Sequence, residues 1–308
     1  MSDNKALTKI RYWIHTVTPL HVGAGRGLGY IDLPVAREKV TNWPYVPGSS
    51  VKGVIADHWG ASKEETRNRE ENKRMKAAFG TAGSGGAEDE GGNAGALVFT
   101  DARLLCLPVR SFYGTFAWIS SPFCLERFKR DMGVDVPIPK PQKDGAAVTK
   151  GSRLGAPGDA KIYLEDLDLE AADDGKTDAL AKKIAGQVFA DDPDWQDAFK
   201  ERFAVVDDDI FTFLCEAGTE VTPHIRISEE TGVAASGALW YEEALPAETI
   251  LTGQVWCDKV YGVKDVTQAD LFESYCGGTQ FLQVGGKAST GKGQVRCVFE
   301  PLDQAGGR

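Results

Sequence analysis

Segments with the two-residue periodicity of half-buried β-strands recur along the chain and are separated irregularly by helical segments. The first covers residues 8–18, and the last lies within residues 281–300. Alternating apolar and polar residues suit strands that turn one face to a core, whereas a doubly wound parallel sheet needs regular strand–helix–strand units. The irregular order therefore predicts an α+β fold with insertions.

Further strands are expected in the middle of the chain and near its end. Residues 96–111 should form two short strands around a turn, residues 224–246 two more, and residues 251–260 another. The longest expected hairpin covers residues 145–169, where the alternation of KIYLEDLDL follows a glycine and proline tip at 155–158. These strands form the β part of the predicted fold.

Apolar residues at helical spacing predict a helix from Ser49, with Ser49 or Ser50 as its N-terminal cap. Further helices are expected at Ser62 to Lys76, Ser121 to Met132, Ala179 to Phe189 and Ile210 to Cys215. By contrast, residues 80–95 contain seven glycines and should form a mobile loop. The length of 308 residues allows one large domain or two modest ones.

The composition bears on the location and redox state of the chain. With 42% hydrophobic and 26% charged residues among 308, the chain can bury a proper core. It has no run of 18 apolar residues and no N-terminal signal peptide, so we expect a cytoplasmic protein with no membrane partner. Its six cysteines stand at least 18 positions apart, which favours reduced, buried thiols over a zinc site or a redox pair.

Acidic and basic residues are unevenly distributed. The net charge of −10 would normally argue against a nucleic-acid partner, yet residues 1–80 hold 13 basic and 8 acidic side chains. Residues 159–220 hold 6 basic and 18 acidic ones, so one acidic block masks a basic first part. This asymmetry is compatible with a polyanion bound on one face. The acidic block is either a solvated surface or a surface that meets a basic neighbour.

Two glycine-rich segments match nucleotide-binding loops only in part. Residues 286–292 satisfy the GxxxxGK pattern, but Gly293 stands where a Ser or Thr would hold magnesium, and only 15 residues follow it. Residues 23–29 do not satisfy GxGxxG in any register. These departures exclude an ATP-binding P-loop and leave a Rossmann site without support.

Both segments can nevertheless bring backbone N–H groups close to phosphate. Arg26 in the first segment, and Lys287 and Lys292 in the second, add positive charge. Lys52 follows the serine cap of its helix, where free N–H groups and the helix dipole favour an anion. Together these residues form a candidate phosphate clamp, and the alternative is that the glycines only satisfy tight turns.

Asp32 is the most exposed candidate for chemistry. It follows the first glycine-rich loop and precedes Pro34, whose ring favours extended backbone, and His21 lies across the same loop. A carboxylate there can bind a divalent cation or accept a proton from a ribose hydroxyl, whereas a turn or capping role is the alternative. Glu242 and Glu243 offer further acid–base groups unless they belong to a solvated strand face.

Six motifs occur together in the order seen in one family of proteins. They are TPLHVGAGRGLGYIDLPVARE, PGSSVKG, RSFYGTFAWISSPFCLERF, HIRISEETG, LWYEEALP and FLQVGGKASTGKG. In these motifs the chain resembles the repeated backbone subunits of type III-B CRISPR Cmr effector complexes, which belong to the RAMP superfamily. The resemblance extends from about Thr18 to Phe299, which is nearly the whole chain.

The resemblance implies a single domain over residues 1–308 with insertions. It implies an RRM-like (ferredoxin-like) palm with inserted fingers and a β-hairpin thumb, which in this sequence corresponds to residues 145–169. It implies copies that polymerise into a helical filament on a CRISPR guide RNA, together with other Cmr subunits. Target single-stranded RNA pairs with that guide, and each thumb displaces one nucleotide at regular intervals beside a cleavage site. The 2′-hydroxyl freed there would attack the scissile phosphate and leave a cyclic phosphate and a 5′-hydroxyl.

The same resemblance assigns roles to residues. Asp32 becomes the catalytic aspartate and a ligand of the required divalent metal, Mg²⁺ or Mn²⁺, with His21 and Glu242 near the active region. The resemblance places Ser49, Ser50, Lys52, Arg110 and Ser111 on the guide RNA, and the glycine-rich segments add Arg26, Gly285, Gly286, Lys287 and Lys292 to the residues expected on RNA. The chain departs from the family pattern at Ala244, where a tyrosine is expected, and in its glycine-rich loop at 80–95.

Two other functions stay open beside an RNA-guided, metal-dependent endoribonuclease subunit. One is a non-catalytic filament protein that only holds guide RNA. The other is a guide-processing RAMP ribonuclease that acts alone and without metal, with His21 or His15 as the general base.

Overall fold

The structure is a computed structural model. It describes residues 9–25, 27, 29–61, 63, 72–80, 92–156, 158, 160–228, 232–260 and 263–301. The strands are β1 (Lys9–Thr16), β2 (Tyr45–Val46), β3 (Leu97–Phe99), β4 (Ala102–Arg110), β5 (Phe116–Ser120), β6 (Gly145–Val148), β7 (Lys161–Leu164), β8 (Leu167–Asp173), β9 (Phe203–Val206), β10 (Glu220–Ile227), β11 (Ala234–Ala244), β12 (Ile250–Cys257), β13 (Thr279–Gln283) and β14 (Gln294–Pro301). The helices are α1 (Gly48–His58), α3 (Lys73–Phe79), α4 (Pro122–Met132), α5 (Gly175–Val188), α6 (Pro193–Arg202), α7 (Asp208–Ala217), α8 (Gln268–Tyr275) and the 3₁₀ helix η2 (Ala288–Thr290).

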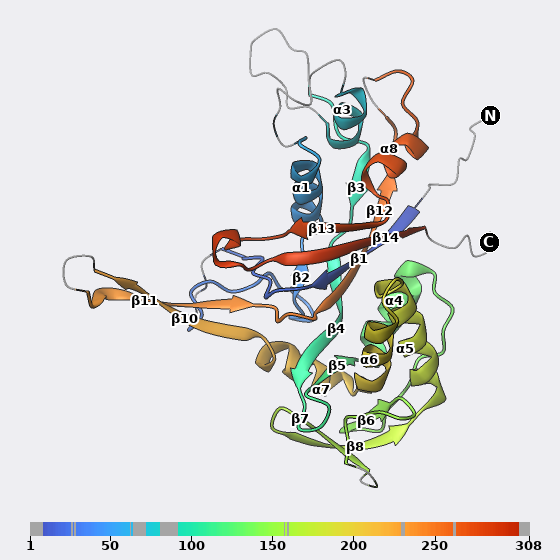
Figure 1. The fold of residues 1–308 in the computed structure, drawn as a ribbon, viewed down its shortest axis with the longest axis vertical. Coiled ribbons are helices and arrows are strands. Elements are labelled where there is room, and N and C mark those ends of the chain that lie inside the picture. Colours follow the sequence, from blue (N-terminus) through green and yellow to red (C-terminus); the bar gives the residue numbers. More distant parts are fainter. Residues whose placement is uncertain are drawn as a thin grey trace.

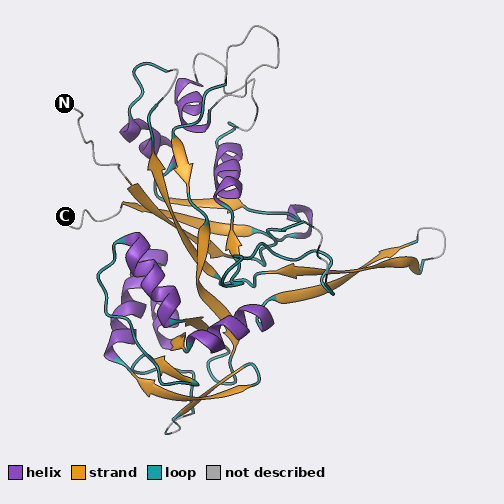
Figure 2. Cartoon of the chain, turned by 180° about the vertical axis from the view of Figure 1, so that it is seen from behind, coloured by secondary structure: helices purple, strands orange, loops and turns teal. Residues whose placement is uncertain are grey.

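One long mixed sheet runs through the molecule in the order β13-β14-β1-β12-β4-β5-β9-β6-β8-β7 (Figure 1). The first five strands pair antiparallel, with β1 between β12 and β14. Helix α1 contacts β3 and β13, and α8 contacts β12. Helices α4, α5 and α6 gather below β1 and β14 in Figure 1, away from α1 and α8, and Figure 2 shows the same group of helices from behind. The mixture of helices and strands confirms the predicted α+β class.

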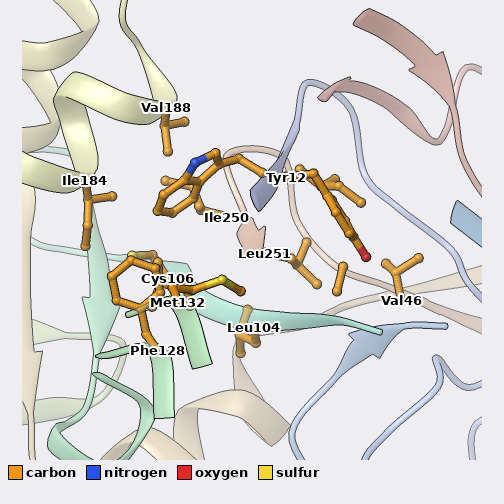
Figure 3. Packing of buried hydrophobic residues seen from close by; sticks show 14 of the residues in the cluster. Tyr12, Val46, Leu104, Cys106, Phe128, Met132, Ile184, Val188, Ile250 and Leu251 are labelled. Atoms are coloured by element: carbon orange, nitrogen blue, oxygen red, sulfur yellow. The ribbon is translucent and has the colours of Figure 1, made fainter. Parts of the chain in front are cut away.

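The core joins the central strands to the helices that cover them. Trp13 on β1 and Trp118 on β5 are fully buried, and burying a large apolar side chain of this kind contributes about 1.5–3 kcal/mol. Figure 3 shows Phe128 and Met132 of α4 packed near Cys106 of β4. The same core therefore fixes α4 against the middle of the sheet.

All six cysteines are free and buried, which confirms the prediction for their side chains. Burial raises the pKa of the Cys124 thiol to about 12 and that of Cys257 to about 11. Such thiols stay protonated and unreactive at neutral pH. Among the described residues, no helix has both the length and the apolar character to cross a membrane.

Local signals located two helices correctly, although one cap differs. Ser121 caps α4 as its motif predicts, because its side chain accepts a hydrogen bond from the Cys124 N–H. Helix α1 also forms, but Pro47 is its N-cap, so the prediction that Ser49 or Ser50 caps it is wrong. The carboxylate of Asp101 accepts the Gly48 N–H at 2.8 Å, which satisfies the helix end from outside the segment.

Residues 145–169 do not form the predicted hairpin, and this prediction is wrong. Strand β6 pairs parallel with β8 and antiparallel with β9, while β7 and β8 make a tight hairpin of their own. The chain reverses at Glu165, whose φ is 49°, so the alternation of KIYLEDLDL belongs to two strands rather than one. The hairpin that projects from the body is β10–β11 (Figures 1 and 2).

The predicted mobile loop at 80–95 falls mostly outside the described residues, since 81–91 are not among them. Its described ends lie together, because Gly80 and Ala94 form an isolated antiparallel bridge. The segment 64–71 of the expected exposed helix also lies outside, and α3 covers the end of that prediction.

Candidate functional site

Asp32 lies where the loop after β1 runs beside strand β11. Leu33 forms a parallel bridge with Glu242, and its N–H donates to the carbonyl oxygen of Tyr241 at 3.1 Å. The Asp32 carboxylate is exposed, and its Oδ2 accepts the Tyr241 N–H at 2.8 Å. Strand β11 therefore fixes the position of this carboxylate while leaving it open to solvent.

The Asp32 carboxylate opens onto a groove of roughly 470 Å³. The groove is lined by Gly27, Asp32, Leu33, Gly237, Leu239, Trp240 and Lys287. A carboxylate, an ammonium group and an aromatic ring thus share one surface that is open to solvent. Arg26, which belongs to the first glycine-rich segment, lies outside the described residues.

Glu242 is completely buried under the second glycine-rich loop. Its Oε2 lies 3.0 Å from Lys287 Nζ, its Oε1 lies 3.0 Å from Lys292 Nζ, and His224 Nε2 is 3.9 Å away. Burial alone would raise the pKa of Glu242, but the hydrogen bonds and charges of the two lysines outweigh it and lower the pKa. Glu242 is therefore an ionised anchor for the loop, neither a solvent-facing acid–base group nor part of a solvated strand face.

The loop between β13 and β14 is held down at both ends. The Gly286 N–H donates to the His21 carbonyl at 2.9 Å, and the Gly293 N–H donates to the Pro19 carbonyl at 2.8 Å. Gly285 has a φ of 77°, and a side chain there would overlap the His21 carbonyl oxygen. Its glycines thus satisfy tight turns against the first loop, and the same turns present Lys287 beside Asp32 in the groove.

The two candidate histidines are buried and hydrogen-bonded. His21 Nδ1 lies 2.6 Å from the Glu243 carbonyl oxygen, so the ring joins the first loop to β11. His15 Nε2 lies 2.6 Å from Glu248 Oε2, and its ring edge meets Phe189. Neither ring lines the groove at Asp32.

The remaining residues expected on RNA lie away from the groove. Lys52 on α1 donates from Nζ to the Leu97 carbonyl at 2.8 Å, and neither Ser49 nor Ser50 lines the groove. Arg110 is 80% exposed and pairs with Glu165 at 2.8 Å. Ser111 is buried beside β7, where it bridges Leu164. The structure therefore does not bring these residues together with Asp32, Lys287 and Lys292.

Sequence reasoning missed Trp240, which lines the groove, and His224, which stacks on Trp240. They face each other across β10 and β11, and their rings stack with centroids 5.5 Å apart at 16°. The available signal was a tryptophan in a strand that alternates beside two glutamates, but its exposure depends on the hairpin projecting from the body.

The donor set at Asp32 permits a metal but does not form a complete site for one. No group of three or more His, Cys, Asp or Glu side chains that could hold a metal occurs in the described part of the chain. Magnesium is commonly held by one or two carboxylates with water and substrate phosphates. A single exposed carboxylate fits that mode, in which RNA would supply the other ligands.

The chain is similar to known proteins over nearly its whole length. The model of the RAMP superfamily matches residues 13–296. The chain is 32% identical over 304 residues to the CRISPR system Cmr endoribonuclease Cmr4 of Pyrococcus furiosus, covering 96% of each protein. The crystal structure of oligomeric Cmr4 from Pyrococcus furiosus superposes with a TM-score of 0.70 and 25% identity, covering 96% of this chain and 100% of that one. A chain in the cryo-EM structure of the type III-B Cmr-beta complex bound to cognate target RNA has the same fold, with a TM-score of 0.68, 19% identity and coverage of 94% and 96%.

Proposed function

The chain belongs to the RAMP superfamily and is a homologue of the Cmr backbone subunit, and from this premise we propose that it binds CRISPR guide RNA and cleaves complementary target RNA. Copies of the chain would assemble along the guide with other Cmr subunits, a proposal that the oligomeric state of the Pyrococcus relative supports. Base pairing with the guide would supply sequence specificity, so that the protein needs only to hold the RNA backbone.

The observation that carries the proposal is the position of Asp32 in an open groove beside Lys287. Lys287 and Lys292 carry two positive charges against the single charge of Glu242, so the loop remains basic overall. A phosphate entering this groove would meet both the Lys287 ammonium group and the Asp32 carboxylate. That pairing suits cleavage of a phosphodiester better than simple retention of an anion, which an acidic group would oppose.

The order of the central strands supports an RRM-like palm. Along the sheet, β14, β1, β12 and β4 lie side by side and antiparallel, while α1 follows β1 and α8 follows β12 in the sequence. This is the arrangement of two split β-α-β units. We assign the thumb role to the projecting β10–β11 hairpin instead of residues 145–169, since β11 borders the groove at Asp32.

Asp32 would accept the proton of the target's 2′-hydroxyl as that oxygen attacks the adjacent phosphate. The attack requires the nucleotide to leave the duplex stack, because stacked A-form geometry keeps the hydroxyl out of line. The bond to the 5′-oxygen then breaks and this oxygen takes a proton from water, leaving a cyclic phosphate and a 5′-hydroxyl. When bound, Mg²⁺ or Mn²⁺ would neutralise charge on the phosphate, with Asp32 as its protein ligand.

A non-catalytic filament subunit is the second candidate. It is favoured by the absence of a second carboxylate or a histidine among the described residues that line the groove. The histidine-based guide-processing function has less support, since His21 and His15 are buried and engaged.

Cleavage by the assembled complex tests the proposal. Complex built with guide RNA and magnesium should cut a labelled complementary RNA into evenly spaced fragments, and complex with Asp32→Asn should bind that RNA without cutting it. Wild-type complex that binds the target and leaves it intact would establish the second candidate. Cutting at the wild-type rate by the Asp32→Asn complex would remove Asp32 from the mechanism.

A further inference from the structure

An aromatic platform lies beside the candidate catalytic carboxylate. Trp240 lines the same groove as Asp32 and is half-buried, so part of its indole meets solvent. Behind it, the His224 imidazole stacks on the indole at a centroid distance of 5.5 Å and an angle of 16°. The pair is directly opposed across the β10–β11 ladder, which fixes both rings on one face of the hairpin.

The platform is braced from below. His224 Nε2 lies 3.9 Å from Glu242 Oε2, and that buried carboxylate holds Lys287 and Lys292. Stacking on the imidazole uses one face of the indole ring. The indole is therefore positioned by a rigid cluster, and a buried core role does not account for its partial exposure in the groove.

The groove thus combines three chemical groups that match the parts of one nucleotide. A flat aromatic ring can stack on a base, the Lys287 ammonium can pair with a phosphate, and the Asp32 carboxylate can meet a ribose hydroxyl. Every base has a π-face, so stacking of this kind accepts any sequence. This tolerance is what a guide-directed subunit requires, because it must act on many targets.

We propose that Trp240 stacks on the base of the target nucleotide that is displaced next to the scissile phosphate. The proposal rests on the proposed function and deepens it by assigning the base subsite of the same groove. A nucleotide that leaves the duplex loses its stacking partners, and an aromatic ring at the cleavage site replaces one of them. Trp240 would thereby hold the ribose and phosphate in line near Asp32.

A photocrosslinking experiment tests the contact without relying on cleavage. Target RNA carrying 5-iodouridine at the displaced position is bound to complex containing Asp32→Asn and irradiated, and the adduct is located by peptide mass spectrometry. The adduct is expected on Trp240, and Trp240→Leu should abolish it. Tyr241→Leu is the matched control, because Tyr241 is the next aromatic residue of β11, does not line the groove, and keeps its backbone bond to Asp32. An adduct on another residue, or none in complex that binds the target, would overturn the proposal.

A rate experiment separates this proposal from the proposed function. Replacing the displaced nucleotide by an abasic one should slow wild-type cleavage by about tenfold, the effect of losing one base–aromatic stack. Trp240→Leu should slow cleavage of ordinary target to the same extent and show no further loss on the abasic target, while Trp240→Phe restores most of the rate. If Trp240→Leu and the abasic nucleotide together slow cleavage by the product of their separate effects, Trp240 does not stack on that base. The proposed nuclease function would still stand. Failure of the wild-type complex to cut would instead remove the proposed nuclease function, and the crosslink would still decide the contact.

Discussion

The backbone N–H of Tyr241 donates a 2.8 Å hydrogen bond to the Asp32 carboxylate, joining residues 209 positions apart. This bond attaches the loop after β1 to the edge of β11. The Asp32 carboxylate that accepts this bond is exposed. Glu242, the residue after Tyr241 in β11, is buried and binds the basic loop between β13 and β14. The groove therefore exists only when three distant segments are assembled, and its stability should depend on each connection.

The Asp32 connection predicts different effects for two substitutions. Asp32→Asn keeps an acceptor for the Tyr241 N–H, whereas Asp32→Ala removes it, so Asp32→Ala should be less stable by about 1 kcal/mol. Urea unfolding of the two variants measures this difference. Both variants should lose target cleavage by at least about a hundredfold, the contribution of a positioned acid–base group. Equal stability of the variants would show that the bond does not contribute.

Replacing Glu242, which pairs with Lys287 and Lys292, should lower the stability of the fold. Glu242→Gln removes the charge that compensates two lysines, of which Lys292 is only 14% exposed. Because Lys287 can turn toward water, we expect a loss of about 2 kcal/mol, below the 3–5 kcal/mol typical when one partner of a fully buried pair is removed. Thermal unfolding measures it. Lys292→Met should cost more than Lys287→Met, and the reverse order would contradict this account.

Local patterns in the sequence were sufficient for the elements that local forces determine. Strand β1 forms where the alternation predicts a strand, although it is buried on both faces and not half-buried as predicted. Helix α4 follows from its spacing and from Ser121, whose capping bond is made within the same segment. The hairpin at 145–169 was not predictable in this way, because the parallel partner of β6 is β8 and its other neighbour is β9. Pairing between strands depends on the assembled sheet, which periodicity does not encode.

The candidate site was predictable in part for the same reason. A carboxylate after a glycine-rich loop and before a proline is locally exposed, and Asp32 is exposed in the structure. The burial of Glu242 depends on Lys292, which is 50 positions away, and the exposure of Trp240 depends on the projection of β10–β11. Residue type and spacing alone contain no information on either.

Glu38 predicts a pH dependence of stability. Burial raises the pKa of Glu38, but hydrogen bonds from Arg127 at 2.5 and 2.9 Å and from Thr41, with the charge of Arg103, lower it overall. A lowered folded pKa stabilises the protein above the ordinary glutamate value, and that contribution disappears as pH falls through the folded value. Glu38→Gln should thus cost about 2 kcal/mol at pH 7.

The stability gap between wild type and Glu38→Gln should stay constant from about pH 7 to pH 5 and narrow below the ordinary glutamate pKa. Urea midpoints of both proteins, measured from pH 7 to below the ordinary glutamate pKa, provide the test. A gap that widens on acidification would contradict a lowered pKa for Glu38 in the folded state, and Asp135→Asn, at a fully exposed carboxylate, serves as the control.

Alanine substitutions at two glycines of the loop between β13 and β14 should lower the stability of the fold by different amounts. Gly285 and Gly291 both have positive φ, 77° and 81°, but a side chain at Gly285 would overlap the His21 carbonyl, whereas Gly291 faces open space. Gly291→Ala should cost about 1 kcal/mol through backbone strain alone. Gly285→Ala should cost about 3 kcal/mol because steric overlap adds to that strain. Equal losses in urea unfolding would show that the loop relaxes away from His21.

Lys52 either contacts RNA or has a purely structural role, and one pair of measurements separates these two roles. Its Nζ donates to the Leu97 carbonyl at 2.8 Å, which ties α1 to β3. If Lys52 also meets a phosphate of the guide, Lys52→Ala should weaken RNA binding for every sequence and lower the slope of log affinity against log salt by about 0.7. Lys176→Ala, at an exposed lysine in the first turn of α5, should leave the slope unchanged. A loss of about 1 kcal/mol in stability with an unaltered slope would assign Lys52 to the fold alone, since a hydrogen bond of this kind contributes about that much.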